Sequence, residues 1–271
     1  MTIRITGRVN FPSPLNPFVF GAQNPTYPSS ITDRSMAVRE SEFGTPGEPL
    51  AATQVRVRKA ARALGRHGLV HAYGHVSARL DQNSFLVCTA KPMGLITPDE
   101  EGTIVMIDGP LPDGVLGEVR CHQRIYARRN DVNGISRIFP RQVMTLSTFH
   151  RSPMARTGFG TYFFPQPPLW GDPLLLRSDE QAIALAETLG DARAIVMRSN
   201  GAICTGATVE ESVVMAFYLE EAANTELAVM ATGNESESAT YTADQAEIRA
   251  TGTGRIFERM WDYMTARDPE G

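Results

Sequence analysis

The sequence predicts a soluble α/β protein whose short strands alternate with helices around one large core. The chain has 271 residues, which exceeds a typical single domain without reaching two full ones. Hydrophobic residues make up 42% and charged residues 21%, as in globular proteins. Short apolar runs alternate with longer segments of helical spacing. No G-x-G-x-x-G motif or P-loop accompanies this alternation, so a nucleotide-binding fold is not indicated.

Charge and cysteine usage argue against several classes of protein. The net charge is −4 and no block of lysine or arginine occurs, which disfavours a nucleic-acid partner. No apolar stretch reaches the roughly 18 residues of a membrane span, and the N-terminal segment lacks the compact apolar core of a signal peptide. Cys88, Cys121 and Cys204 lie far apart without a C-x-x-C pair, as in a reducing compartment. We therefore expect a cytoplasmic protein that binds neither membranes nor nucleic acid.

Residues 1–48 are predicted to form an arm outside the main domain. Prolines recur throughout this stretch and block regular structure. Aromatic residues are interspersed among them, at Phe11, Phe18, Phe20 and Tyr27. An aromatic-rich arm of this kind is expected to pack on its own core or on a neighbouring subunit.

The main domain is predicted over residues 49–232, and its first half carries most of the expected strands. Helical spacing of apolar residues begins near Thr53 and continues to Leu64, and Gly65 and Gly68 mark its end. The segments that follow are typical of strands at 76–79, 85–89 and 104–107, a helix at 118–129, a strand at 134–139, and a helix that Pro140 opens and that runs to 149.

The second half begins with a predicted loop over residues 151–175, which is rich in proline, glycine and aromatic residues. A helix is expected at 179–189, followed by a strand pair at 194–197 and 202–205 around a Ser-Asn-Gly turn. Thr208 is a candidate N-cap for a long helix that reaches residue 232. Residues 233–271 are predicted to form a polar linker and a helical tail.

Two local patterns are candidates for chemistry. His75 follows Gly74, and a glycine at this place lets a backbone N–H and a polar side chain approach a ligand together. Glu118 and His122 stand four residues apart on one predicted helix and so face the same way. Such a pair suits acid–base work or metal ligation, but it also suits a purely structural hydrogen bond. The residues alone leave these alternatives open.

Several segments together resemble the class II aldolase/adducin family over roughly residues 50 to 232. The matching stretches are Ala60–Leu64, Gly74–Arg79, Thr97–Glu100, Glu118–Tyr126, Asp131–Gly134 and Leu219–Ala223. The resemblance implies a three-layer α/β/α domain with a central, mostly antiparallel sheet. It also implies a homotetramer with its sites between subunits.

The resemblance further implies a metal site, and here the sequence departs from the family. The family's strand carries His-Thr-His-Pro, whereas this chain has Arg137 and Phe139 in the places of the two histidines. The third metal-binding histidine is replaced by Asn200. Arginine does not lose its proton to bind a metal and phenylalanine has no donor atom, so we expect no metal ligands at this site. The family's acid–base carboxylate is matched by Glu118.

The replaced ligands indicate either decay of the site or a change of its chemistry, and we favour the change. Arginine supplies a fixed positive charge with a geometry that suits a carboxylate or phenolate. The sequence analysis therefore assigns three catalytic candidates, His75, Glu118 and His122. Substrate-binding candidates are the residues expected around them: Ser77, Lys91, Arg137, Phe139 and Asn200.

A small aromatic substrate suits a cationic pocket without a metal, because a deprotonated phenol draws on its own ring to stabilise charge. Within the family, the chain is similar to the aminocoumarin-pathway oxygenases of antibiotic biosynthesis in length, arginine-rich composition and the Gly-His-Val-Ser segment. This resemblance implies an oxygenase, with dioxygen as co-substrate, that oxidatively cleaves or decarboxylates the side chain of a 4-hydroxyphenyl compound. The missing ligands favour a metal-independent enzyme without a cofactor, with iron as the alternative.

Two other functions remain open at this point. One is a lyase or decarboxylase of the same fold that acts on an aromatic acid and binds a metal elsewhere, with His75 and His122 as candidate ligands. The other is a non-catalytic assembly protein built on the aldolase scaffold. We expect a closed pocket, with Arg137 paired to Glu118, if the protein only assembles, and an open cavity lined by both residues if it is an enzyme.

Overall fold

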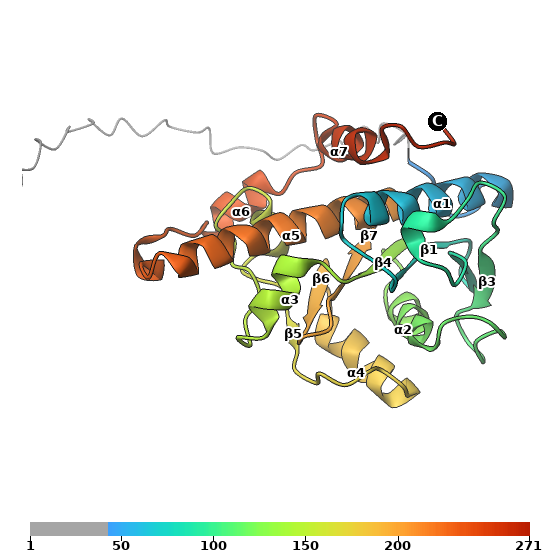
Figure 1. The fold of residues 1–271 in the computed structure, drawn as a ribbon, viewed down its shortest axis with the longest axis horizontal. Helices are drawn as coiled ribbons and strands as arrows, with labels where there is room; N and C mark the ends of the chain where they lie inside the picture. The colour runs from blue at the N-terminus through green and yellow to red at the C-terminus, as the bar shows by residue number, and fades with distance from the viewer. Residues whose placement is uncertain (1–42) are drawn as a thin grey trace, which may run out of the picture. The chain divides into compact units, whose positions relative to one another are not determined.

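A seven-stranded sheet forms the centre of the computed structural model, which describes residues 43–271 (Figure 1). Most of the predicted arm, residues 1–42, lies outside the described residues. The strand order is β3-β2-β1-β4-β7-β6-β5. The strands are β1 (His75–Arg79), β2 (Ser84–Val87), β3 (Thr103–Met106), β4 (Gly134–Ile138), β5 (Leu169–Trp170), β6 (Ala194–Met197) and β7 (Ala202–Gly206).

Neighbouring strands pair antiparallel throughout, except that β5 pairs parallel to β6. The predicted mostly antiparallel sheet is therefore confirmed. The prediction of an unbroken loop over 151–175 is wrong at Leu169 and Trp170, which form the edge strand β5. This strand is only two residues long and directly follows Pro168, so it offers no alternating pattern to detect.

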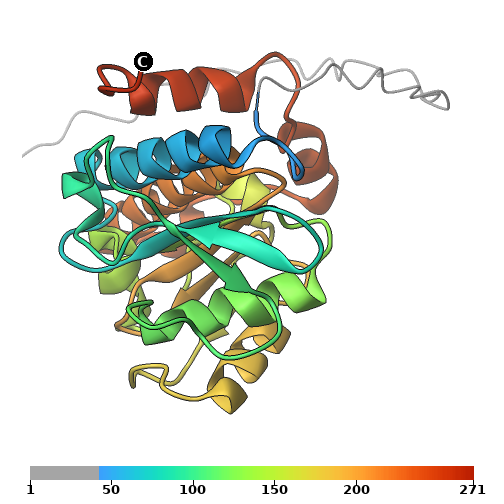
Figure 2. The same ribbon diagram turned by 90° about the vertical axis from the view of Figure 1, so that its right-hand side faces the viewer.

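Helices cover both faces of the sheet, which confirms the three-layer α/β/α architecture. Figure 2 shows α1 (Leu50–Arg66) and α5 (Val209–Ala231) on one side and α2 (Arg120–Arg128) and α4 (Asp179–Leu189) on the other. The remaining helices are α3 (Arg141–Ser147), α6 (Ala243–Arg249) and α7 (Ile256–Thr265), with single 3-10 turns at Met93–Leu95, Gly117–Val119, Gly160–Phe163 and Glu235–Glu237. Among residues 43–271, no helix is long and apolar enough to cross a membrane.

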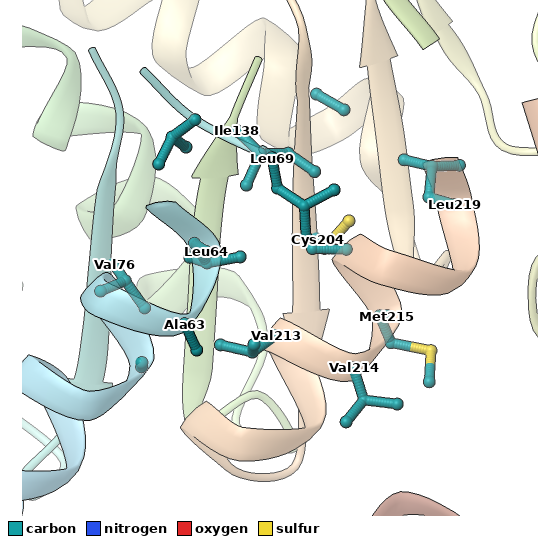
Figure 3. Packing of buried hydrophobic residues seen from close by; sticks show 14 of the residues in the cluster. Ala63, Leu64, Leu69, Val76, Ile138, Cys204, Val213, Val214, Met215 and Leu219 are labelled. Carbon is teal, nitrogen blue, oxygen red and sulfur yellow. The ribbon is translucent and has the colours of Figure 1, made fainter. Parts of the chain in front are cut away.

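Each face of the sheet has its own hydrophobic cluster because successive side chains of a strand point to opposite faces. In β4, Ile138 packs with α1 and α5, while Ile135 packs with α2 and α4. Figure 3 shows the first cluster, in which Leu64 of α1 and Val213 of α5 lie against the strands. The site described below depends on the same alternation, because it uses polar residues on the α2 face.

Helix starts follow the sequence signals closely. The hydroxyl of Thr208 accepts a hydrogen bond from the backbone N–H of Glu211 (3.1 Å), so the predicted N-cap of α5 is confirmed. Ser178 and Gln181 form a reciprocal capping box at the start of α4. The predicted helices and strands of the main domain all occur, with ends that differ by a few residues.

The C-terminal segment after α7 is tied to α1 by buried ion pairs. Arg62 donates from Nε and Nη2 to the two carboxylate oxygens of Asp268 at 2.9 and 2.7 Å. Arg58 makes the same two-pronged contact with Glu270, at 3.0 and 2.5 Å. The Asp268 side chain is fully buried, so its charge depends on these partners.

Replacing Asp268 with asparagine is therefore expected to destabilise the protein by about 2 kcal/mol or more, because Arg62 loses a bidentate partner in a buried place. The measurement is the free energy of unfolding in urea. Asp262→Asn is the matched control, since its ion pair with Arg255 is 3.8 Å long and exposed. Equal effects of the two changes would contradict a structural role for the buried pair.

Candidate functional site

A pocket of about 810 Å³ opens where β1 begins and β4 ends. These two points are adjacent because the strands are antiparallel, with His75 paired directly to Arg137. Gly74 and His75, the turn between β6 and β7, and the 3-10 turn that carries Glu118 contribute to the wall. The apolar part of the lining includes Tyr73, Leu116, Phe139, Leu175 and Leu176.

A chain of hydrogen bonds leads from the pocket into the layer between the sheet and α2. His75 Nδ1 lies 2.9 Å from His122 Nε2, and His122 Nδ1 lies 2.7 Å from the hydroxyl of Ser77. The Ser77 hydroxyl also lies 2.9 Å from the hydroxyl of Tyr126. His75 and Ser77 share a face of β1, and His122 and Tyr126 share a face of α2 one turn apart. The two-residue repeat of strand β1 and the roughly four-residue repeat of helix α2 therefore bring the four polar groups together.

Both histidines of this hydrogen-bond chain, His75 and His122, are neutral near pH 7. Burial, with a smaller contribution from the charge of Arg137, lowers the pKa of His122 to about 3. Burial also holds the pKa of His75 well below its usual value, with contributions from His122 and Arg137. Nε2 of His75 has no hydrogen-bond partner, although it is buried. Since His75 lines the pocket, its ring places a buried nitrogen without a hydrogen-bond partner at the pocket wall.

Arg137 is completely buried beside this chain. Its Nη1 donates to the backbone oxygen of Ile138 (2.9 Å), and its guanidinium lies over the ring of Phe139 at 4.1 Å from the centroid. Its Nη2 forms an ion pair with Glu118 Oε2 at 3.3 Å, but neither Nη2 nor Nε makes a hydrogen bond. A guanidinium keeps its charge even where burial lowers its pKa, so a fixed cation lies behind the pocket wall.

Three further cations line the pocket itself. Lys91 is paired with Glu100, and Arg120 donates to Asp179 at 2.7 Å. Arg177 is exposed, and no carboxylate among residues 43–271 forms an ion pair with it. The wall contains one carboxylate, Glu118, which faces Arg137. This balance favours an anionic ligand.

The three residues that the sequence resemblance set against metal ligands are poor ligands for a metal ion. Arg137, Phe139 and Asn200 offer a fixed cation, a hydrocarbon ring and an amide. Both ring nitrogens of His122 are already engaged in hydrogen bonds, so the histidine pair has one free nitrogen to offer. In the part of the chain that the structure describes, no group of three His, Cys, Asp or Glu side chains is placed to hold a metal ion.

The structure places the candidates of the sequence analysis in two layers. His75, Glu118, Lys91, Phe139 and Asn200 line the pocket. The other three, Ser77, His122 and Arg137, lie behind the wall and do not contribute to it. Of the three catalytic candidates, His75 and Glu118 therefore lie at the pocket wall, and His122 lies behind it.

Some residues of the site were missed from the sequence. Tyr126 stands four residues after His122, and the helical spacing that linked Glu118 to His122 also points to it. Arg177 carries no comparable signal, because it reaches the pocket through the path of the loop before α4. Arg120 lies two residues after Glu118 in the sequence, but its direction depends on the 3-10 turn that precedes α2.

Comparisons with known proteins agree with this fold. The aldolase II superfamily protein from Pseudomonas syringae superposes with a TM-score of 0.68 at 22% identity, covering 82% of this chain and 92% of that one. A 3,4-dihydroxyphthalate decarboxylase from Arthrobacter keyseri is 24% identical over 246 residues, or 83% of this chain and 98% of that protein. A protein of the same name from Rhodococcus jostii is 24% identical over 233 residues, or 79% and 95%.

The family model of the class II aldolase and adducin N-terminal domain matches residues 55–227, which span all seven strands, helices α2 to α4 and most of α1 and α5. The match also includes the histidine pair and the cationic pocket wall. Because it covers more than half of the chain, this protein belongs to the class II aldolase and adducin family.

Proposed function

We propose that this protein is a decarboxylase that acts on a hydroxylated aromatic acid. The observation that carries the proposal is the free Nε2 of His75 in a pocket that is apolar on one side and cationic on the other. An apolar wall suits an aromatic ring, and Arg177 suits a carboxylate. The two curated relatives described above bear the name of a decarboxylase of such an acid.

The proposed reaction needs one group that accepts and returns a proton. The phenolic proton of the substrate passes to Nε2 of His75, and the ring becomes electron-rich. The ring carbon that bears the carboxylate then takes this proton. The bond to the carboxylate breaks, carbon dioxide leaves, and the bonding electron pair restores the aromatic phenolate. Water finally protonates the phenolate, so one proton is consumed for each carbon dioxide released.

The neighbouring residues support these steps by their charge. Burial and the charge of Arg137 lower the pKa of His75, so its protonated form is a strong acid toward the ring carbon. The cations of the wall stabilise the phenolate and so make its proton easier to remove, which compensates for the weakness of His75 as a base. We assign substrate orientation to Glu118, Phe139 and Asn200, which lie on the same wall.

The comparisons favour this alternative of the sequence analysis over the aminocoumarin-type oxygenase. Decarboxylation needs neither dioxygen nor a metal-bound intermediate, and the three residues that the sequence resemblance set against metal ligands are poor ligands for a metal ion. We therefore propose a cofactor-free reaction. The proposed homotetramer follows from the family resemblance alone, and its test is the mass of the protein in solution.

A non-catalytic assembly protein is the second candidate, and one observation favours it. Arg137 is paired with Glu118, as expected for a site that has lost its chemistry. The pocket is nevertheless open at about 810 Å³, and Nε2 of His75 is unpartnered. Both features favour an enzyme, because a decayed site tends to fill with side chains.

The direct test is to incubate the purified protein with 3,4-dihydroxyphthalate and a panel of ortho-hydroxylated benzoic acids. Carbon dioxide release is measured beside oxygen consumption. We expect one carbon dioxide for each substrate consumed, without oxygen uptake and without loss of rate after treatment with a chelator. Oxygen uptake in step with turnover would support the oxygenase instead, and an inert protein would support the assembly function.

Replacing His75 with glutamine is expected to lower kcat by about 100-fold or more, the usual range for loss of a proton-transfer group. His71→Gln is the control, since His71 is exposed and lies outside the pocket wall. The measurement is the initial rate of carbon dioxide release with both variants. A His75 variant that retains full activity would remove this residue from the reaction.

Replacing Arg177 with glutamine is expected to raise KM about 10-fold, which corresponds to about 1.4 kcal/mol of binding energy. The physical reason is the loss of a cation that no carboxylate of residues 43–271 neutralises. Arg128→Gln removes the same charge from an exposed part of α2 outside the pocket and serves as the control. Equal KM values for the two variants would contradict a carboxylate-binding role.

The pH dependence of kcat/KM gives a further prediction. Because the pKa of His75 is lowered from its ordinary value of 6.5, the neutral, proton-accepting form persists below that pH. The acid limb of the profile is therefore expected below pH 6.5, and circular dichroism in the same buffers checks that the protein stays folded. An acid limb centred at or above pH 6.5 would assign the base role to another group.

A further inference from the structure

The hydrogen-bond chain behind the pocket ends at Tyr126, whose role goes beyond the proton transfer proposed for His75. Its hydroxyl lies 3.2 Å from the backbone oxygen of Ser77 and 2.9 Å from the Ser77 hydroxyl. A carbonyl oxygen only accepts, so the tyrosine donates its single proton to it. The tyrosine oxygen is then left as an acceptor for the Ser77 hydroxyl.

This assignment fixes every other proton in the chain. The Ser77 hydroxyl donates to Tyr126, so its oxygen accepts from Nδ1–H of His122. A neutral imidazole carries one proton, which leaves Nε2 of His122 as an acceptor for Nδ1–H of His75. Nε2 of His75 then carries a lone pair. In the reverse arrangement each donor and acceptor is exchanged, and Nε2 of His75 carries a proton instead.

The electrostatics favour the first arrangement. Arg137 is paired with His75 across β1 and β4, and the two side chains share the α2 face. A lone pair on Nε2 is attracted to this cation, whereas an N–H would be repelled by it. Burial also raises the pKa of Tyr126, so the phenol keeps its proton. Protons therefore do not leave the hydrogen-bond chain at this end.

We infer that Tyr126, acting through Ser77, is a positioning residue that sets the tautomers of both histidines and so presents a lone pair of His75 to the pocket. The chain orients a proton acceptor and does not conduct protons, because it ends at a buried phenol. This inference rests on the proposed function only for its kinetic consequence. The tautomers themselves are properties of the protein without substrate.

The test is solid-state nitrogen NMR on the full chain labelled at histidine, which distinguishes a protonated ring nitrogen from a bare one. In the wild-type protein we expect Nδ1 to be protonated and Nε2 bare in both His75 and His122. Signals are assigned by their loss in His75→Gln and His122→Gln. The opposite pattern in the wild-type protein would overturn the inference.

Tyr126→Phe tests the cause. Without the phenol, the Ser77 hydroxyl is expected to turn and donate to Nδ1 of His122, which reverses both tautomers. Tyr162→Phe is the matched control, because the Tyr162 hydroxyl donates to the backbone oxygen of Thr251 (2.8 Å) outside this chain. Unchanged tautomers in folded Tyr126→Phe would show that the phenol does not set them.

The kinetic arm separates this inference from the proposed function. If the protein releases carbon dioxide, Tyr126→Phe is expected to lower kcat by about 100-fold while KM changes little. If Tyr126→Phe reverses the tautomers but keeps full activity, Tyr126 sets the tautomers of the free protein, and its part in catalysis is overturned. If the wild-type protein shows the expected tautomers but decarboxylates none of the acids, the proposed function is refuted and the tautomer assignment stands.

Discussion

The burial of one guanidinium governs the electrostatics of this site. Arg137 lies wholly inside the protein, between the sheet and α2, and its compensation comes from Glu118, a backbone oxygen and the face of Phe139. A buried cation without such partners would be strongly destabilising. With them, its charge adds to the effect of burial, which lowers the pKa of both adjacent histidines and keeps them neutral.

The pocket and the groups behind it divide the proposed chemistry between them. Residues of the wall, such as His75 and Glu118, contact the ligand, while His122 and Ser77 determine how His75 holds its proton. Such a division is common where an imidazole must keep one tautomer. The fixed charge behind this arrangement belongs to Arg137, a side chain of β4 in the sheet.

The fold was more predictable from the sequence than the site. Glycine and proline mark the ends of most elements, and short apolar runs between them indicated the strands, so the architecture followed with one short strand missed. The clustering of His75, Glu118 and His122 was also foreseeable. The depth of Arg137 was not, because burial of a charge depends on neighbours from β1 and α2 that no local pattern reveals. Arg177 was missed for the same reason, since its place depends on a loop.

The pairing of His75 with Arg137 has a consequence for how this chain tolerates change. A slip of β1 by one residue against β4 would turn His75 toward the hydrophobic layer under α1 and α5 and bring Val76 to the α2 face. Such a slip would ruin the packing before it altered any reaction. Selection for a dense interior therefore also preserves the alignment of the polar groups, and single-residue insertions in either strand should be rare among functioning relatives.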